Sequence, residues 1–232
     1  MKVLSGNELT GELTSKAFAG IALNHFSVRD NKIAGNLTDI SSMFPEFRTF
    51  DIRSNHITGS IPNEIGQAKH LKRLLLADNR LTGKLPSSIG NVLGLEQVLV
   101  EDNRIDGELP NSLFQCTDLE VLSLSQNRIG GTIPTDLAKL SRLESFDVRA
   151  NNFVGEVPEG VNNLQRLTLF DVSANQFEGS IPQGVCGATT FREFAFTRAN
   201  CRVNEEYDEW DGGIVSCPCC SSCCDRDGTF CS

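Results

Sequence analysis

Apolar and polar positions recur along this chain with a fixed period of 24 residues. In each complete unit, an apolar residue falls eight, five and three positions before an asparagine, as Leu119, Leu122 and Leu124 do before Asn127. Leu122 and Leu124 alternate with polar Ser123, which is the pattern of a β-strand with one buried face. The repetition predicts a stack of one small unit whose strands lie side by side in a parallel sheet.

A glycine follows each of these asparagines at four positions, and from the third unit a proline follows at seven positions. The glycine permits a left-handed turn and the proline favours an extended segment. The asparagine is polar but flanked by core positions, so we expect its carboxamide to bond to turn backbone in adjacent units. The predicted asparagine ladder consists of Asn31, Asn55, Asn79, Asn103, Asn127, Asn151 and Asn175.

The segments from asparagine to proline, such as those at 55–62 and 79–86, resemble the N-x-L-T-G-x-I-P phrase of plant-type leucine-rich repeats. Such repeats are found in the ectodomains of receptor-like kinases and in polygalacturonase-inhibiting proteins. The resemblance covers roughly residues 1 to 200. It implies a leucine-rich repeat solenoid, a horseshoe or right-handed superhelix. A parallel β-sheet is then expected on the concave face and short helical or 3-10 segments on the convex face.

Two regions are expected along the chain. Residues 1–199 form the solenoid, with eight 24-residue units, the first one truncated, and a ninth strand at 191–198. Phe191, Phe194 and Phe196 repeat the strand spacing there. Residues 200–232 form a cysteine-rich C-terminal cap or tail.

Cysteines are concentrated at that end: Cys186, Cys201, Cys217, Cys219, Cys220, Cys223, Cys224 and Cys231. An even count beside the apolar end of a solenoid favours a disulfide-rich cap. Two C-x-x-C spacings leave a metal or redox cluster as an alternative, and a disordered tail is a third. We expect the pair Cys186–Cys201, which brackets the last strand, while the other pairings stay open. Cys116 occupies a core position and is expected to be a buried free thiol.

The tail also resembles the carboxyl terminus of leucine-rich repeat proteins predicted in diatoms, on its terminal Phe-rich strand, its acidic stretch at 205–211 and its C-x-C-C-x-x-C-C end. Those relatives commonly carry a cytosolic segment and a membrane-spanning helix before the repeats. At the other end, Lys2 stands where other units place a core residue. We therefore expect that the chain begins within a repeat and that a cap and an anchor or signal precede it.

The composition of the chain limits the classes of partner that are expected. The net charge of −9 argues against nucleic acid or an anionic membrane surface as the main partner. No stretch approaches the ~20 apolar residues that a membrane-spanning helix needs. No cofactor or metal is expected. We expect an extracellular or cell-surface location, with a cytoplasmic one as the alternative, and the single sequon at Asn36 is the expected glycosylation site.

The outward side chains of the strands are expected to form the binding face. Leu75, Leu99 and Val121 are predicted to make an exposed apolar patch with a charged rim, as protein contacts have; ordinary scattered surface residues are the alternative. Asp51 with Arg53, and Asp147 with Arg149, are each expected to bridge locally. The candidate partner-binding residues are Arg29, Arg53, Arg73, Leu75, Leu99, Glu101, Val121 and Arg149.

An enzyme is not expected. His25, His56 and His70 fall in different registers, and no carboxylate pair has the spacing for glycoside hydrolysis. The sequence favours a non-enzymatic, receptor-like recognition module that binds a protein, peptide or glycan on its concave face. A secreted inhibitor of a cell-wall hydrolase and a structural or adhesive cell-surface protein are the alternatives.

Overall fold

The computed structural model describes residues 2–14, 24–180, 182, 193–194 and 215–216. Most of the expected cap at 200–232 therefore lies outside the described residues. All eight cysteines of the predicted disulfides also lie outside the described residues: Cys186, Cys201, Cys217, Cys219, Cys220, Cys223, Cys224 and Cys231. Within the described ranges, no helix has the length and apolar character to cross a membrane.

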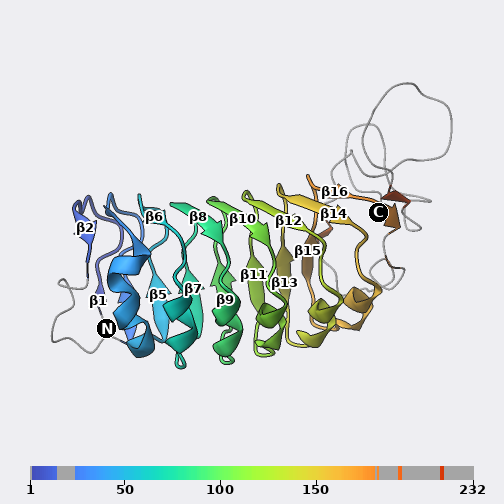
Figure 1. Ribbon diagram of the computed structural model, residues 1–232, viewed down its shortest axis with the longest axis horizontal. Coiled ribbons are helices and arrows are strands. Elements are labelled where there is room, and N and C mark those ends of the chain that lie inside the picture. The colour runs from blue at the N-terminus through green and yellow to red at the C-terminus, as the bar shows by residue number, and fades with distance from the viewer. Residues whose placement is uncertain (1, 15–23, 181, 183–192, 195–214, 217–232) are drawn as a thin grey trace, which may run out of the picture.

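The described residues contain a nine-stranded parallel sheet that runs along the long axis of the molecule (Figure 1). Each strand pairs with the equivalent residues of the next repeat, 24 positions on, as Phe50 does with Leu74 and Leu122 with Phe146. The strands, in spatial order, are β1 (Lys2–Val3), β3 (His25–Ser27), β5 (Thr49–Asp51), β7 (Arg73–Leu75), β9 (Gln97–Leu99), β11 (Val121–Ser123), β13 (Ser145–Asp147), β15 (Leu169–Asp171) and β18 (Glu193–Phe194). β18 falls within the predicted ninth strand at 191–198.

A second parallel sheet, which the sequence analysis did not anticipate, runs along the upper edge of the molecule in Figure 1. In β10 exposed Arg104 and Asp106 alternate with buried Ile105, so the second sheet also has one buried face. Its strands are β6 (Thr58–Gly59), β8 (Arg80–Lys84), β10 (Arg104–Glu108), β12 (Arg128–Gly131), β14 (Asn152–Gly155) and β16 (Gln176–Phe177). Two further strand pairs are β2 (Glu12–Leu13) with β4 (Ala34–Gly35), and β17 (Gly179–Ser180) with β19 (Val215–Ser216).

Short 3-10 helices return each repeat to the next strand, along the lower edge in Figure 1. The proline of each phrase caps the helix in an extended conformation, with φ −76° and ψ 154° at Pro62. It thereby fixes where the turn begins, because its φ is locked and it needs no hydrogen-bond acceptor. The helices are η2 (Leu37–Glu46), η3 (Asn63–Gln67), η4 (Ser87–Asn91), η5 (Asn111–Gln115), η6 (Thr135–Lys139) and η7 (Glu159–Asn163).

The asparagine ladder ties each repeat to the one before it. Asn103 Nδ2 donates to the carbonyl of Leu76 in the preceding repeat and to those of Val100 and Glu101 in its own repeat, each at 3.1 Å. Its Oδ1 accepts the backbone N–H of Leu81 at 2.9 Å. The same set of contacts recurs from Asn31 to Asn175. The amide and the carbonyl group of every ladder carboxamide are thus hydrogen-bonded to backbone.

The residue before each ladder asparagine has a left-handed backbone, as Asp102 shows with φ 54°. Non-glycine residues rarely adopt this conformation, so the ladder geometry imposes it. The glycine four positions after each ladder asparagine also has a left-handed backbone, with φ 76° at Gly107, a conformation that glycine adopts without strain.

The core is a continuous apolar column between the two sheets and the 3-10 helices. Aromatic rings stack between successive repeats within it, with 5.5 Å between the ring centroids of Phe146 and Phe170. Cys116 is a fully buried free cysteine, and burial raises the pKa of its thiol to about 11. It therefore behaves as a small apolar core residue.

Candidate concave binding face

The outward positions of the nine-stranded sheet form the concave face. Backbone pairing places Asp51, Leu75, Leu99, Ser123 and Asp147 in one row across five strands. Neighbouring strands lie about 4.8 Å apart, so successive side chains of the row are close enough to touch. The row begins and ends with carboxylates and is apolar or small in the middle.

The predicted exposed apolar patch is only partly present. Leu99 and Val121 are half-buried, whereas Leu75 is 6% exposed and does not belong to the core column. Its cover therefore comes from neighbours on the concave face, where it lies in register with Asp51 and Leu99. The expectation that Leu75 is exposed is wrong, because its neighbours on the two adjacent strands shield it from both sides.

Glu101 is the half-buried carboxylate beside this apolar pair. Its Oε2 atom is buried and has no hydrogen-bond partner among the described residues. Burial raises the pKa of Glu101, whereas hydrogen bonds from its own backbone and from the Ser123 side chain, together with the charge of Arg53, act in the opposite direction. A desolvated carboxylate of this kind is strongly attracted to a donor or cation brought by a ligand.

Asp51 and Arg53 form a tight local pair, as expected. Arg53 Nε donates to Asp51 Oδ1 and Arg53 Nη2 to Asp51 Oδ2, both at 2.9 Å. Ser27 also donates its hydroxyl to Asp51 Oδ2 at 3.2 Å. The hydrogen bonds of Arg53 to Asp51 raise the pKa of Arg53 above its ordinary value, and Asp51 is only 5% exposed. The pair is a rigid part of the face.

The second Asp-x-Arg pair behaves differently. Asp147 accepts the backbone N–H of Arg149 at 3.0 Å, but the guanidinium of Arg149 lies nearer the next repeat, 3.9 Å from Asp171 Oδ2. The expected local bridge is therefore absent. Burial raises the pKa of Asp147, and the negative charge of Asp171 adds to this effect.

Asp171 was not among the predicted site residues, although it occupies the same register as Asp147 one period later. It is 7% exposed, and it accepts the Ser173 hydroxyl at 2.6 Å. The other two predicted arginines are both exposed. Arg29 forms a surface ion pair with Asp30 at 3.0 Å, and Arg73 begins β7.

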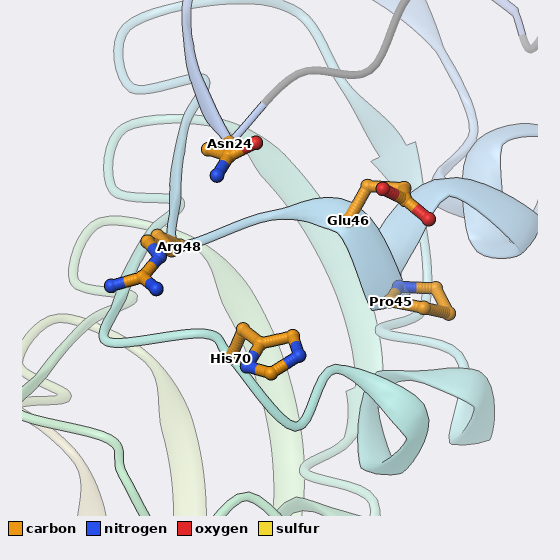
Figure 2. A pocket seen from close by; sticks show the side chains of 5 residues that line it. All are labelled: Asn24, Pro45, Glu46, Arg48 and His70. Carbon is orange, nitrogen blue, oxygen red and sulfur yellow. The ribbon is translucent and has the colours of Figure 1, made fainter.

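A hollow of about 410 Å³ lies away from this face, at the entry to the strands. Asn24, Pro45, Glu46, Arg48 and His70 line it. Figure 2 shows the Glu46 carboxylate and the Arg48 guanidinium pointing to opposite sides. The hollow therefore lacks a set of converging functional groups.

The remaining polar candidates are dispersed. His25 Nδ1 lies 3.1 Å from the Thr49 hydroxyl on the concave face, His56 is exposed, and His70 lines the hollow. Nowhere in the described ranges do three or more His, Cys, Asp or Glu side chains gather as a metal site requires. The sequon residue Asn36 caps η2, and its Oδ1 accepts the N–H of Thr38 at 2.9 Å.

Comparison with known proteins identifies the repeat. The leucine-rich repeat family model matches residues 46–68, 70–92 and 118–140. The structure of a plant peptide hormone receptor, RGFR1 in complex with RGF2, superposes with a TM-score of 0.77 and 28% identity, covering 84% of this chain and 32% of the receptor chain. The chain is a leucine-rich repeat solenoid that is similar to plant receptor ectodomains. A comparison with curated protein sequences found no match.

Two further structures share this leucine-rich repeat architecture. The Arabidopsis receptor kinase HAESA, in complex with the peptide hormone IDA and the co-receptor SERK1, has a TM-score of 0.76 and 25% identity over 92% of this chain. The PEPR1–AtPEP1 structure has a TM-score of 0.69 and 27% identity over 84% of this chain. The chain spans about one third of the length of these proteins, 33% and 31% respectively.

Proposed function

We propose that this chain is a non-enzymatic recognition module that binds a peptide, or an extended segment of a protein, across its concave face. The observation that carries the proposal is the row from Asp51 to Asp147. Half-buried, apolar Leu99 in this row lies two residues before the half-buried carboxylate of Glu101, on a sheet held rigid by the asparagine ladder. Apolar surface with a few oriented polar groups is the usual anatomy of a peptide contact.

The comparisons support the same class of ligand. RGFR1 is a peptide hormone receptor in complex with RGF2, and HAESA is in complex with the peptide hormone IDA. We therefore propose a peptide or protein partner in preference to a glycan on this face. Because these relatives are plant receptors, we also propose an extracellular or cell-surface location. No feature of the described residues favours the hydrolase inhibitor or the adhesive protein.

To test the proposal, peptides that bind the full chain are selected first. Their binding is then measured to a variant whose concave face is blocked. Peptides enriched from a random phage-displayed library would be measured against the wild type and the variant Ser123→Trp, which places a large ring in the middle of the row. Binding is expected to fall at least about tenfold, because a blocked contact of this kind costs 1.4 kcal/mol or more. The matched control is Leu93→Trp, since Leu93 is 61% exposed and follows η4 on the convex side.

Thermal unfolding of both variants verifies that they fold. Enriched peptides that bind Ser123→Trp as well as they bind the wild type would contradict the proposal. A library that yields no specific peptide would contradict it as well.

A further inference from the structure

A row of basic side chains crosses the second sheet, away from the concave face. Arg80, Arg104 and Arg128 occupy the first position of β8, β10 and β12, and all three are exposed. Exposed His56 and Lys32 stand at the same register position one and two repeats earlier. These positions extend over five consecutive repeats, although Lys32 already pairs with Glu8 at 3.5 Å. β8, β10 and β12 lie along the upper edge in Figure 1.

The three arginines of the row have no internal partner. None of them forms an ion pair or a side-chain hydrogen bond with a described residue. Asp106 is in register with Arg128 in the sheet, yet the two charged groups do not pair. On the concave face, by contrast, Arg29, Arg53 and Arg149 each approach a carboxylate.

Register fixes the spacing of the row. Arg104 pairs with Thr82, two residues after Arg80, and Arg128 pairs with Asp106, two residues after Arg104. One strand across and two residues along give steps of roughly 8 Å between Cα atoms. Like charges at this distance repel each other. Asp106, in register with Arg128, offsets part of this repulsion but forms no ion pair with any of the three arginines, which leaves the guanidinium groups available to a ligand.

The surroundings of the row are polar. The exposed positions beside it are hydroxyl-bearing Thr58, Ser60 and Thr82, basic Lys84, and acidic Asp106 and Glu108. A protein contact has an apolar or aromatic centre, and this part of the sheet presents none. A hydrophilic chain with regularly repeated negative charges fits it better.

We propose that the row binds an acidic polysaccharide, with the guanidinium groups of Arg80, Arg104 and Arg128 pairing with carboxylate or sulfate groups on successive parts of the chain. Guanidinium is suited to this role, because it forms two parallel hydrogen bonds to such anions. The net charge of −9 for the whole chain does not oppose this binding, because screening confines the interaction to groups within about 10 Å.

The experiment measures the binding of alginate, dextran sulfate, neutral dextran and poly-glutamate to the full 232-residue chain. Alginate tests carboxylates on sugars, dextran sulfate tests sulfates, and poly-glutamate tests an acidic polypeptide. We expect alginate, dextran sulfate or both to bind, and neutral dextran not to bind. In the triple variant Arg80→Gln, Arg104→Gln, Arg128→Gln, the affinity is expected to fall at least about tenfold, because three exposed ion pairs are lost.

The matched control removes the same charge elsewhere, with Lys139→Gln, Arg142→Gln and Arg166→Gln, all three exposed near η6 and η7. An equal loss in this control would show binding by overall charge and overturn the proposal. Tighter binding of poly-glutamate than of either polysaccharide, or no binding of either, would overturn it too.

A stability measurement separates binding from a structural role. Because the three arginines form no ion pair with a described residue, the arginine triple variant is expected to unfold at the same urea concentration as the wild type or at a higher one. A lower midpoint would mean that the arginines serve the fold, which contradicts the proposal.

Discussion

The two Asp-x-Arg repeats of the concave face share a local sequence but differ in structure. At β5, Arg53 turns back and holds Asp51 with two hydrogen bonds. At β13, Arg149 reaches instead toward Asp171 of the following repeat. The cause lies one repeat further along the chain, where the residue in register with Asp51 is Leu75 and the residue in register with Asp147 is Asp171. The residue in the neighbouring repeat therefore determines whether the arginine pairs with the aspartate of its own repeat.

The largest effect is expected from replacing the ladder asparagine that follows each of the two Asp-x-Arg pairs. Comparing the two variants tests whether the ladder supports both repeats equally. Asn55 and Asn151 make the same four contacts with backbone. Replacing either with alanine leaves buried carbonyls and one N–H unsatisfied. Each variant is therefore expected to lose about 3 kcal/mol of unfolding free energy in urea denaturation.

Asn7→Ala is the control for these variants. The side chain of Asn7 is exposed and, among the described residues, donates only to the carbonyls of Leu4 and Ser5 within its own loop, so a change within about 0.5 kcal/mol is expected. If the losses at the two buried positions differ by more than about 1 kcal/mol, the scaffolds are not equivalent, and the difference between the surface pairs cannot be attributed to the side chains alone.

A smaller effect distinguishes the two aspartates. Asp51→Asn removes the charge from a buried bidentate pair and leaves Arg53 without its partner, so we expect a loss of about 2 kcal/mol in the unfolding free energy. Asp147→Asn removes a carboxylate that burial already disfavours, so a change within about 0.5 kcal/mol is expected. Equal losses in urea denaturation would mean that both pairs contribute alike, contrary to the geometry.

The smallest effect is a change of titration. Asp171→Asn removes the neighbouring negative charge, so the pKa of Asp147 should fall toward its ordinary value. The raised folded-state pKa of Asp147 contributes stability that is fully present below the unfolded-state pKa and is lost as the pH rises through the folded-state pKa. In the variant this loss should be smaller.

Carboxyl NMR titration of Asp147, with urea denaturation from about pH 3 to about pH 6, measures both quantities. Asp136→Asn serves as the control, because Asp136 pairs with Lys139 on η6, away from this face. An unchanged Asp147 pKa in Asp171→Asn would indicate that Asp171 has no influence on it.

Much of the solenoid could be predicted from sequence, because each element has a local cause. The 24-residue period set the strand register, since a slip of one position would turn every buried leucine outward. Asn103 could be assigned to the ladder because a polar residue between core positions needs internal partners. The turn glycines and the capping prolines followed from backbone conformations that few other residues accept.

The features that could not be predicted from the sequence depend on contacts between repeats. The second sheet was not foreseen, because Arg104 and Asp106 around Ile105 alternate over too short a stretch to be recognised as a strand. The burial of Leu75 depends on its neighbours in the adjacent repeats, and the choice of Arg149 depends on Asp171. These features depend on contacts between two neighbouring repeats, so they cannot be predicted from the pattern within one repeat.

The ladder has a consequence for how such a molecule changes over evolutionary time. Each carboxamide contacts the preceding turn at constant sequence offsets, as Asn103 does with Leu81 and Leu76. Duplication or deletion of one whole unit would therefore recreate every contact at the junction, whereas gain of a single amino acid would break several at once. Length can vary in steps of one unit, and each added unit contributes a fresh set of surface positions on which selection can act.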